Sequence, residues 1–282
     1  MMKRAAPYLF LLPAVLIVGL FVLIPMVQVV CVSFLRYSFF GPNEFIGLEN
    51  YRALFRDPNF WWTLSNSLLY VLVTPVLMVV SLIVALSIRR SVKSAKLLRL
   101  SFFLPVITPV VVVGIMWKWM FTEETGIINY LLSLTGLPHI PWLTNYPTNM
   151  VSVMILTVWR GFGYYMMIIL AGLALIPSEI EEAGTLDGAT PFQQVIHILL
   201  PNLKPTLLFI FIVSSSSAVK LFTELYVLIP GVPMSNKTLV AYLYRISFER
   251  FDFGYGSAIA VVIFIITSVF SYANFRMMEQ RS

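Results

Sequence analysis

The chain has 282 residues, of which 59% are hydrophobic and 11% are charged, and its formal net charge is +6 at pH 7. With a mean hydropathy of +0.87, this composition is typical of a protein that crosses the bilayer several times and excludes an ordinary soluble domain. The positive charge by itself would suit nucleic acid, but the basic residues cluster beside apolar segments, so no nucleic-acid partner is expected. The single Cys31 excludes an internal disulfide.

Hydropathy divides the chain into runs long enough to cross about 30 Å of hydrocarbon as helices. The first run contains Pro13 and Pro25 and is longer than the apolar region of a signal peptide, so we expect a retained span. We predict an all-α integral membrane protein with one transmembrane domain over residues 1–282. Its six spans are expected near 8–34, 64–88, 101–121, 150–176, 203–229 and 256–275.

The distribution of basic residues predicts the orientation. Five of them crowd into one short loop: Arg89, Arg90, Lys93, Lys96 and Arg99. Loops on the other side carry more scattered basic residues that acidic residues offset. Because short cytoplasmic loops are enriched in Lys and Arg, we expect both termini in the cytoplasm.

A polar stretch at residues 178–201 lies between the fourth and fifth runs, on the expected cytoplasmic side. Ser178 and Glu181 predict a capping box, and Thr190 with Gln193 predicts a second one. Gly188 stands where a helix end needs a left-handed residue. Pro201 is expected to end the second helix, so we predict a hairpin of two short helices that are unstable unless they dock onto something.

This stretch resembles a known family. Glu182-Ala183-Gly184, Asp187-Gly188-Ala189 and Ile198-Leu199-Leu200-Pro201 are similar to the EAA loop of ABC-importer permeases, and residues 179–189 resemble its form in carbohydrate-uptake permeases. Gly184 departs from the usual alanine, and we expect the same close packing with a looser helix. The resemblance implies a coupling helix that lies in a cleft of a cytoplasmic ATPase. The residues implied in ATPase coupling are Glu181, Glu182, Ala183, Gly184, Asp187, Gly188, Ala189, Ile198 and Pro201.

Other segments carry the same resemblance: 45–51, 102–105, 117–121, 171–177 and 251–258. The family implies a non-catalytic permease subunit in the plasma (inner) membrane of a bacterium or archaeon. It also implies a second, related permease subunit in a heterodimer, two ATPase subunits that bind ATP and Mg, and an extracytoplasmic solute-binding protein. No cofactor is expected on this chain. The implied substrate is a di- or oligosaccharide or a polyol glycoside, and glycerol phosphate remains an alternative.

Polar residues inside the fourth and fifth spans are candidates for the substrate pathway, because a charge within the bilayer costs at least about 2.5 kcal/mol and should face a wet cavity. We expect Trp159 and Tyr164 to stack on a sugar, and Arg160 to bond its hydroxyls. The candidates are Trp159, Arg160, Tyr164, Ser214, Ser217, Lys220 and Glu224.

Two other interpretations of these charged residues stay open. Lys220 and Glu224 share a helix face at i, i+4 and could form a structural pair, with Arg160 anchoring a helix contact. Alternatively, Arg160, Lys220 and Glu224 could form the relay of an ion- or proton-coupled secondary carrier.

Several motifs for other activities are incomplete. The segment Gly231–Thr238 resembles a phosphate-binding loop but has Asn236 in place of the second glycine and follows an apolar span, so no ATPase is expected on this chain. His139 and His197 are expected on opposite sides of the membrane, which argues against a metal site. The sequence offers no Ser-His-Asp set, so an intramembrane enzyme is not favoured.

Overall fold

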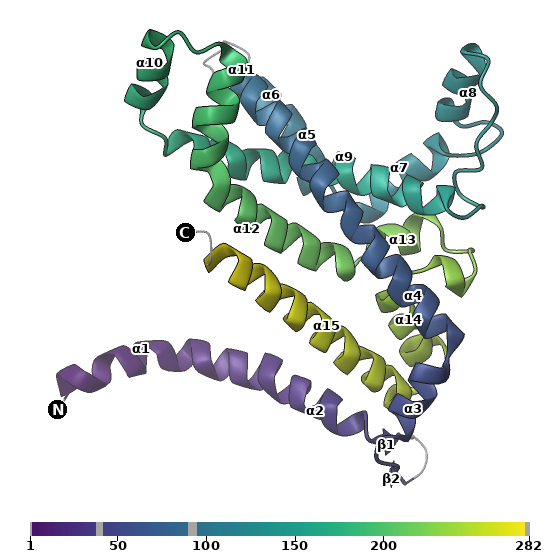
Figure 1. Cartoon of the computed structure of the whole chain (residues 1–282). Helices are drawn as coiled ribbons and strands as arrows, with labels where there is room; N and C mark the ends of the chain where they lie inside the picture. The colour runs from purple at the N-terminus through teal and green to yellow at the C-terminus, as the bar shows by residue number, and fades with distance from the viewer. Residues whose placement is uncertain (1, 38–41, 90–94, 280–282) are drawn as a thin grey trace. The chain divides into compact units, whose positions relative to one another are not determined.

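The computed structural model describes residues 2–37, 42–89 and 95–279. These residues are almost entirely helical and form two compact units, residues 1–61 with 239–266, and residues 62–238 with 267–282. The boundaries of the units fall inside the helices α4 (Pro58–Leu69) and α15 (Phe253–Glu279). Each unit is described separately below (Figure 1).

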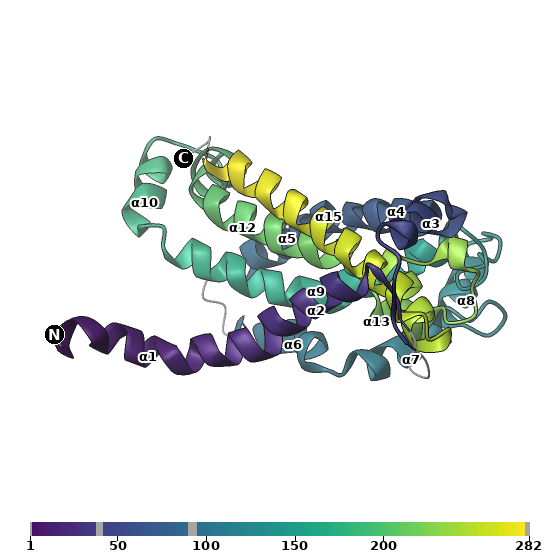
Figure 2. The same ribbon diagram turned by 90° about the horizontal axis from the view of Figure 1, so that it is seen from below.

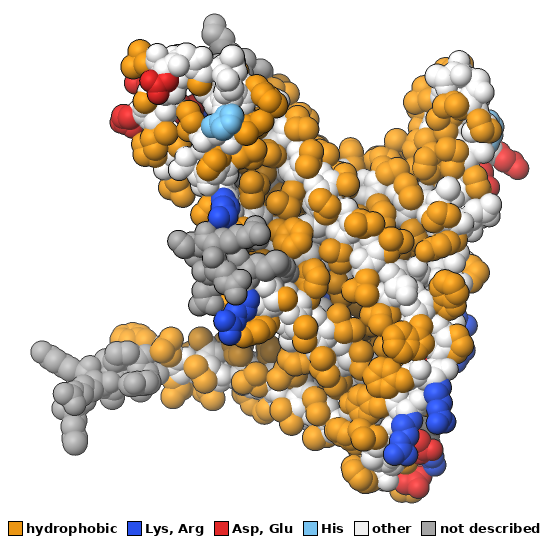
Figure 3. Space-filling model, viewed as in Figure 1, with side chains coloured by type: hydrophobic (Ala, Val, Ile, Leu, Met, Phe, Trp, Pro, Cys, Tyr) orange, Lys and Arg blue, Asp and Glu red, His pale blue; other side chains and the backbone are white. Residues whose placement is uncertain are grey.

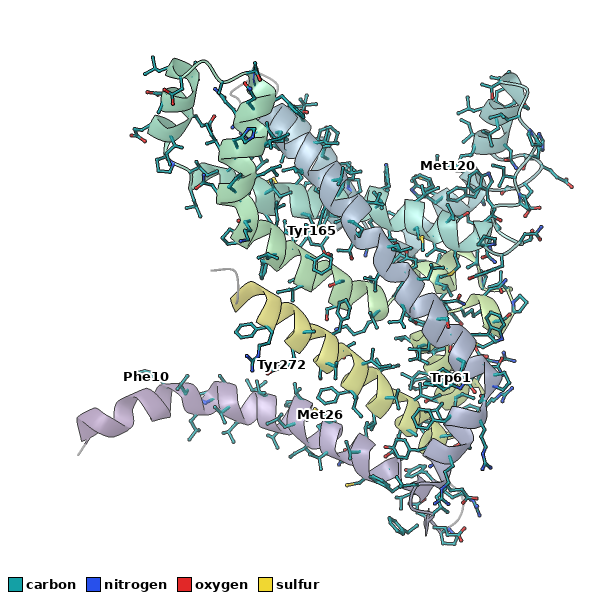
Figure 4. All side chains as sticks on the ribbon, in the orientation of Figure 1. Phe10, Met26, Trp61, Met120, Tyr165 and Tyr272 are labelled. Carbon is teal, nitrogen blue, oxygen red and sulfur yellow. The ribbon has the colours of Figure 1, made fainter. Side chains whose placement is uncertain are left out.

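The first unit begins with a long apolar helix. Its parts are α1 (Met2–Val18), a π-helical turn (Gly19–Leu23) and α2 (Ile24–Val32). Most described side chains of this stretch are exposed, Phe10 and Met26 among them (Figure 4). A surface of this kind suits lipid or another apolar helix rather than water.

The rest of the first unit is a small cap around an acidic residue. The strands β1 (Leu35–Arg36) and β2 (Glu44–Phe45) pair antiparallel, and the helices α3 (Glu49–Arg56) and α14 (Leu239–Tyr244) complete it with the start of α15. Asp57 accepts hydrogen bonds from the hydroxyls of Tyr242 and Tyr255 and from the Asn59 backbone N–H. Burial raises the pKa of Asp57, but these hydrogen bonds outweigh it and hold the pKa below its ordinary value. Burial and the bond to Asp57 raise the pKa of Tyr242 to about 12.

The second unit is a bundle around α9 (Thr148–Ala174), on which α5 (Val73–Ile88), α6 (Ala95–Ile107) and α12 (Leu200–Val219) pack. The helix α7 (Val110–Met120) packs on α13 (Thr223–Leu228), and α8 (Ile127–Leu134) follows α7. Glycines allow the closest approaches: a Cβ on Gly163 would lie 2.0 Å from the Phe102 carbonyl oxygen, and one on Gly172 would lie 2.6 Å from Thr206 Oγ1. Small residues at such contacts are how membrane helices pack tightly.

The short helices α10 (Ser178–Leu186) and α11 (Pro191–Gln194) lie at one end of this bundle and α8 lies at the other, as Figures 1 and 2 agree. This arrangement within the second unit matches the prediction that the 178–201 hairpin and the loop after the third span face opposite sides of the membrane.

The described residues contain five helices that are long and apolar enough to span a membrane: Phe10–Val32, Pro58–Ile88, Thr148–Ala174, Pro191–Val219 and Phe253–Ala273. An all-α membrane protein is therefore confirmed, but the third expected span is not one helix. Lys96–Ile107 and Val110–Met120 meet at an angle of 96°. Pro109 causes the break, because it has no N–H to donate and disfavours helical backbone at Thr108.

Boundaries of the second and fifth spans also differ from the sequence prediction. The second span begins earlier, at Pro58, and includes a 3₁₀ turn at Tyr70–Leu72. The fifth span ends at Val219 instead of 229, and α13 follows after a break. Of the basic loop used to predict the orientation, Arg90 and Lys93 lie outside the described residues.

Candidate functional site

A polar cavity of about 340 Å³ lies inside the second unit, between α5, α9 and the break that follows α12. Six of the seven residues predicted for the substrate pathway line it: Arg160, Tyr164, Ser214, Ser217, Lys220 and Glu224. Polar residues that sequence reasoning missed also line it: Tyr70, Thr74, Thr157, Tyr165 and Thr223. Cavities with convergent polar groups in an otherwise apolar bundle are the usual form of a ligand site.

The interruption between α12 and α13 opens one wall of the cavity. The helix α12 ends at Val219 with Lys220 as its C-cap residue, and Phe222, with φ −141° and ψ −56°, is not helical before α13 begins. The Thr238 hydroxyl donates a hydrogen bond of 2.6 Å to the Leu221 carbonyl, which the interruption leaves without a helical partner. Irregular backbone at membrane depth is tolerated where it is buried or lines a cavity, as here.

An ion pair crosses the cavity from α9 to α13. Arg160 Nη2 lies 2.8 Å from Glu224 Oε1, and the two side chains are 32% and 11% exposed. One interpretation left open by the sequence paired Lys220 with Glu224, and it is wrong on this point: α12 ends at Val219, before Lys220, so the i, i+4 relation does not hold. The structure confirms instead that Arg160 anchors a contact between helices. Lys220 lines the cavity and forms no ion pair with any described residue.

Hydroxyl groups that line the cavity can still form hydrogen bonds with a ligand. Ser214 donates to the Ile210 carbonyl at 2.7 Å and Ser217 donates to the Val213 carbonyl at 2.9 Å. Because a serine hydroxyl has one proton, both oxygens are left as acceptors. Thr74 Oγ1 is buried and has no hydrogen-bond partner among the residues that the structure describes. The cavity therefore presents acceptors from α12 and cations from Arg160 and Lys220, which can bind a solute with many hydroxyls.

Aromatic residues close the cavity on the α9 side. Tyr165 is buried and lies on the part of α9 that runs beside α5 and α12 (Figure 4). Tyr164 packs edge-on against it with ring centroids 5.1 Å apart and is 44% exposed. The exposed face of Tyr164 suits stacking, as predicted. Trp159, also predicted to stack, instead packs on Trp117 and lines a separate apolar cavity.

Tyr70 joins the same region from the turn between α4 and α5. Its hydroxyl donates to the Val153 carbonyl at 3.0 Å and contacts the Thr157 hydroxyl. The sequence signal for these residues was weak, because single Tyr or Thr residues in an apolar run are compatible with an ordinary interior. Only the packing of α5 against α9 brings them beside Arg160.

The second candidate site is the hairpin at residues 178–201. The α10 helix ends in a Schellman motif: Gly188 has φ +80°, its N–H donates to the Thr185 carbonyl, and the Ala189 N–H donates to the Gly184 carbonyl. The capping box of Thr190 and Gln193 is present, as predicted. The box expected at Ser178 is absent: Pro177 is the N-cap residue, and Ser178 already belongs to the helix.

The second helix of the hairpin does not end at Pro201, contrary to the prediction. Residues 191–219 form one continuous helix, in which a π-helical turn at Val195–Leu199 precedes Pro201. The wider turn changes the hydrogen-bond pattern where the proline N–H is missing, so the helix continues. The hairpin is therefore joined directly to the fifth span, because its second arm and that span are one helix.

Several contacts attach α10 to the bundle, and two of them involve predicted coupling residues. Arg89 Nη1 at the end of α5 lies 3.0 Å from Glu181 Oε1, with side chains 14% and 30% exposed. Gly184 is buried against Ile198: a Cβ there would lie 2.4 Å from Ile198 Cδ1. This confirms the close packing expected of a small residue at Gly184. Glu181, which was predicted to couple to the ATPase, therefore contacts Arg89 of its own chain.

The remaining surface of the hairpin is exposed and combines acidic with apolar side chains. Leu186 is 89% and Phe192 is 73% exposed, and Glu182, Ala183 and Asp187 are exposed beside them. Figure 3 shows acidic and hydrophobic side chains together over α10. An apolar surface of this kind that the chain itself leaves uncovered is typical of a protein-binding site.

Among the residues that the structure describes, no group of three or more His, Cys, Asp or Glu side chains is placed to hold a metal ion. The phosphate-loop-like segment forms a 3₁₀ turn at Met234–Asn236, and Asn66 Nδ2 donates to the Ser235 and Lys237 carbonyls. The helix α13, and not a β-strand, precedes this segment, whereas a phosphate-binding loop follows a buried strand.

Residues 58–282 match the family described as binding-protein-dependent transport system inner membrane component. The chain is 36% identical over 284 residues to the probable ABC transporter permease protein YurN of Bacillus subtilis, covering 98% of this chain and 97% of that protein. It is 35% identical over 280 residues to the arabinooligosaccharides transport system permease protein AraP of the same organism, covering 98% and 89%. A chain in the crystal structure of a bacterial alginate ABC transporter, in complex with an alginate pentasaccharide-bound periplasmic protein, has a similar fold. Its TM-score is 0.88 at 20% identity, covering 99% of this chain and 96% of that one.

Proposed function

This chain belongs to the family of inner membrane components of binding-protein-dependent transport systems, and we propose that it is the permease subunit of an ATP-driven importer of a sugar. In this function it forms half of the path through the membrane and carries no catalytic residue of its own. The substrate class is a di- or oligosaccharide or a polyol glycoside, in line with the arabinooligosaccharides in the name of the relative AraP.

The observation that carries this proposal is the polar cavity between α5, α9 and α12. A sugar loses many hydrogen bonds to water when it enters a membrane protein, so the path must replace them. Ser214 and Ser217 offer acceptors to sugar hydroxyls, Lys220 offers donors, and Tyr164 offers an aromatic face. The cavity is open on one side, where the related permease subunit of a heterodimer completes it in our proposal.

The Arg160–Glu224 pair positions the walls of this path. It joins α9 to α13, and α13 packs on α7 beyond the break in the third span. Since a pair cancels most of the charge inside the bilayer, the cavity remains polar without a large desolvation cost. Movement of α9 relative to α13 would lengthen this ion pair. The distance between the two side chains would therefore distinguish two conformations of the path.

The hairpin supplies the coupling to ATP hydrolysis in this proposal. The exposed Leu186 and Phe192, with Glu182 and Asp187 beside them, bind a groove with basic walls on a cytoplasmic ATPase subunit. Two such subunits bind ATP and Mg and hold the hairpin in different positions in their two states. This difference drives the conformational change of the permease. A partner that bound both conformations of the permease equally well would not shift the equilibrium between them.

The orientation follows from the same assignment. In this proposal the end of the bundle with α10 faces the cytoplasm, and the opposite end with α8 receives the sugar from a solute-binding protein. Both termini are assigned to the cytoplasm as well. The basic residues beside α10, of which Arg89 and Arg99 are described, agree with a cytoplasmic location.

The test is sugar uptake into proteoliposomes that contain the assembled importer, with the solute-binding protein and labelled oligosaccharides outside. We expect uptake only when ATP is enclosed, with or without a proton gradient. Tyr164→Ala and Ser217→Ala should each reduce uptake at least several-fold, while ATPase subunits still co-purify. Uptake that persists without ATP and follows the proton gradient would instead establish the secondary carrier and refute the proposal.

A further inference from the structure

A second polar cavity, of about 290 Å³, lies at the end of the bundle that carries α10. Its walls come from the end of α5, from α6, from the end of α9 and from α10. The residues that line it are Arg89, Arg99, Leu170, Leu173, Ala174 and Glu181. It shares no residue with the transport cavity described above.

The charges in this second cavity do not balance. Arg89 forms an ion pair with Glu181 at 3.0 Å, but Arg99 forms no ion pair with any described residue. Within the described residues, the Arg99 guanidinium has one hydrogen bond, which is long, 3.5 Å from Nη2 to the Ile88 carbonyl. Its Nε is shut off from solvent and has no hydrogen-bond partner in that part of the chain. The head group is therefore held against the protein without a counter-ion, although burying a charge in this way is costly unless it is paired.

The guanidinium of Arg99 determines which chemical groups could bind in this cavity. Guanidinium binds the oxygens of phosphate or carboxylate with two parallel hydrogen bonds, and this match is strongest where water is partly excluded. The opposite wall is apolar, formed by Leu170, Leu173 and Ala174. A ligand that joins an anionic head to hydrocarbon fits both walls.

The surface next to the cavity indicates the source of that anion. Leu97, Leu100 and Leu104 of α6 are 66%, 61% and 56% exposed, and they recur at helical spacing beside Arg99. In a membrane protein such an exposed apolar stripe faces acyl chains. Basic pockets at the cytoplasmic ends of membrane helices are known binding sites for the head groups of anionic lipids.

We propose that the phosphate group of an anionic membrane lipid binds in this cavity, between Arg99 and Arg89, with its acyl chains along α6. Arg89 also binds Glu181 of α10, so the lipid phosphate, Arg89 and the hairpin form one connected group. The lipid phosphate pairs with Arg99 and shares Arg89 with Glu181, which stabilises the observed position of α10. This proposal concerns lipid binding and does not depend on the identity of the transported solute.

The experiment uses the full-length chain, purified in uncharged detergent and titrated with phosphatidylglycerol or phosphatidylcholine, with binding followed by native mass spectrometry. We expect phosphatidylglycerol to bind more tightly than phosphatidylcholine. The variant Arg99→Gln should weaken phosphatidylglycerol binding about five-fold, as expected for the loss of one basic residue at a membrane surface. Arg99→Lys, which keeps the charge, should weaken it less.

Two further variants keep the test decisive. Lys96→Gln removes an exposed cation of the same helix that does not line the cavity, and it should leave the affinity unchanged. Ala174→Phe fills the cavity without removing a charge and should weaken phosphatidylglycerol binding, which covers the case that Arg99→Gln does not fold.

A third titration, with inorganic phosphate, distinguishes the two sources of the anion. Displacement of the lipid by millimolar phosphate in an Arg99-dependent manner supports a phosphate site that free phosphate can also occupy. Equal affinity of Arg99→Gln and the unmodified chain for phosphatidylglycerol, or an equal loss in Lys96→Gln, overturns the proposal.

Discussion

The Arg160–Glu224 pair allows an asymmetric prediction about stability. The Glu224 side chain is 11% exposed and that of Arg160 is 32% exposed. Removing one member of a buried pair leaves the other charge uncompensated, at a cost of about 3–5 kcal/mol when that charge is fully buried. Arg160→Met strands the more deeply buried carboxylate and should cost about 3–5 kcal/mol. Glu224→Gln strands an arginine that water partly reaches, so its cost should be smaller, about 2 kcal/mol.

The assay is thermal unfolding of the purified chain in detergent, where Arg160→Met should lower the midpoint on the order of 10 °C. The double variant Arg160→Met/Glu224→Gln should be more stable than Arg160→Met alone, because it leaves no buried charge. Lys220→Met is the control: Lys220 lines the same cavity without an ion partner among the described residues, so its loss should change the midpoint little. A double variant as unstable as the sum of the single ones would refute the reasoning, since independent losses add.

Three further predictions concern the hairpin and the outer cap. Gly188→Val should cost about 1–2 kcal/mol because Gly188 has φ +80°. It should also reduce uptake in proteoliposomes, whereas Gly188→Asn, which tolerates this backbone, should retain most uptake. Leu186→Asp should leave the unfolding midpoint unchanged, because Leu186 is 89% exposed, but should abolish co-purification of ATPase subunits; normal co-purification would contradict the proposed docking face. Because hydrogen bonds hold the pKa of Asp57 below its ordinary value, its carboxylate stabilises the fold above the unfolded pKa of about 3.9, and this stability is lost as the pH falls through the folded pKa. The decrease of the unfolding midpoint between pH 5 and about 2 should therefore be smaller in Asp57→Asn than in the unmodified chain.

The error at Lys220 and Glu224 shows where helix periodicity misleads. The i, i+4 rule presupposes an unbroken helix, and residues 206–229, around the break, contain no proline or glycine that announces it. The helix nevertheless ends at Val219, because Arg160 from α9 binds Glu224 and the Thr238 hydroxyl binds the Leu221 carbonyl. Both partners are distant in the chain, so no local pattern indicates them.

Two prolines have opposite effects on helix continuity, and the local backbone explains the difference. Pro109 ends one helix and starts another at a bend of 96°, whereas Pro201 lies inside a continuous helix. The difference is the π-helical turn at Val195–Leu199, which accommodates the missing N–H before Pro201. Whether a proline interrupts a membrane helix depends on such local adjustments and on neighbouring helices.

The sequence by itself determined the features that arise from short-range chemistry. Long apolar runs must become helices in a membrane, because the backbone there has no water to bond, and this placed the fourth span within two residues of its observed position. The turn at Gly188 and the capping box at Thr190 follow from backbone conformation and side chains within a few residues.

The tertiary structure alone decided which distant groups meet. It paired Arg160 with Glu224 and Arg89 with Glu181, added Tyr70 and Thr157 to the cavity, and moved Trp159 out of it. The reason is that these contacts depend on how α5, α9 and α12 are rotated and spaced. That rotation is set by the packing of many residues at once, including the close approach that Gly172 permits between α9 and α12.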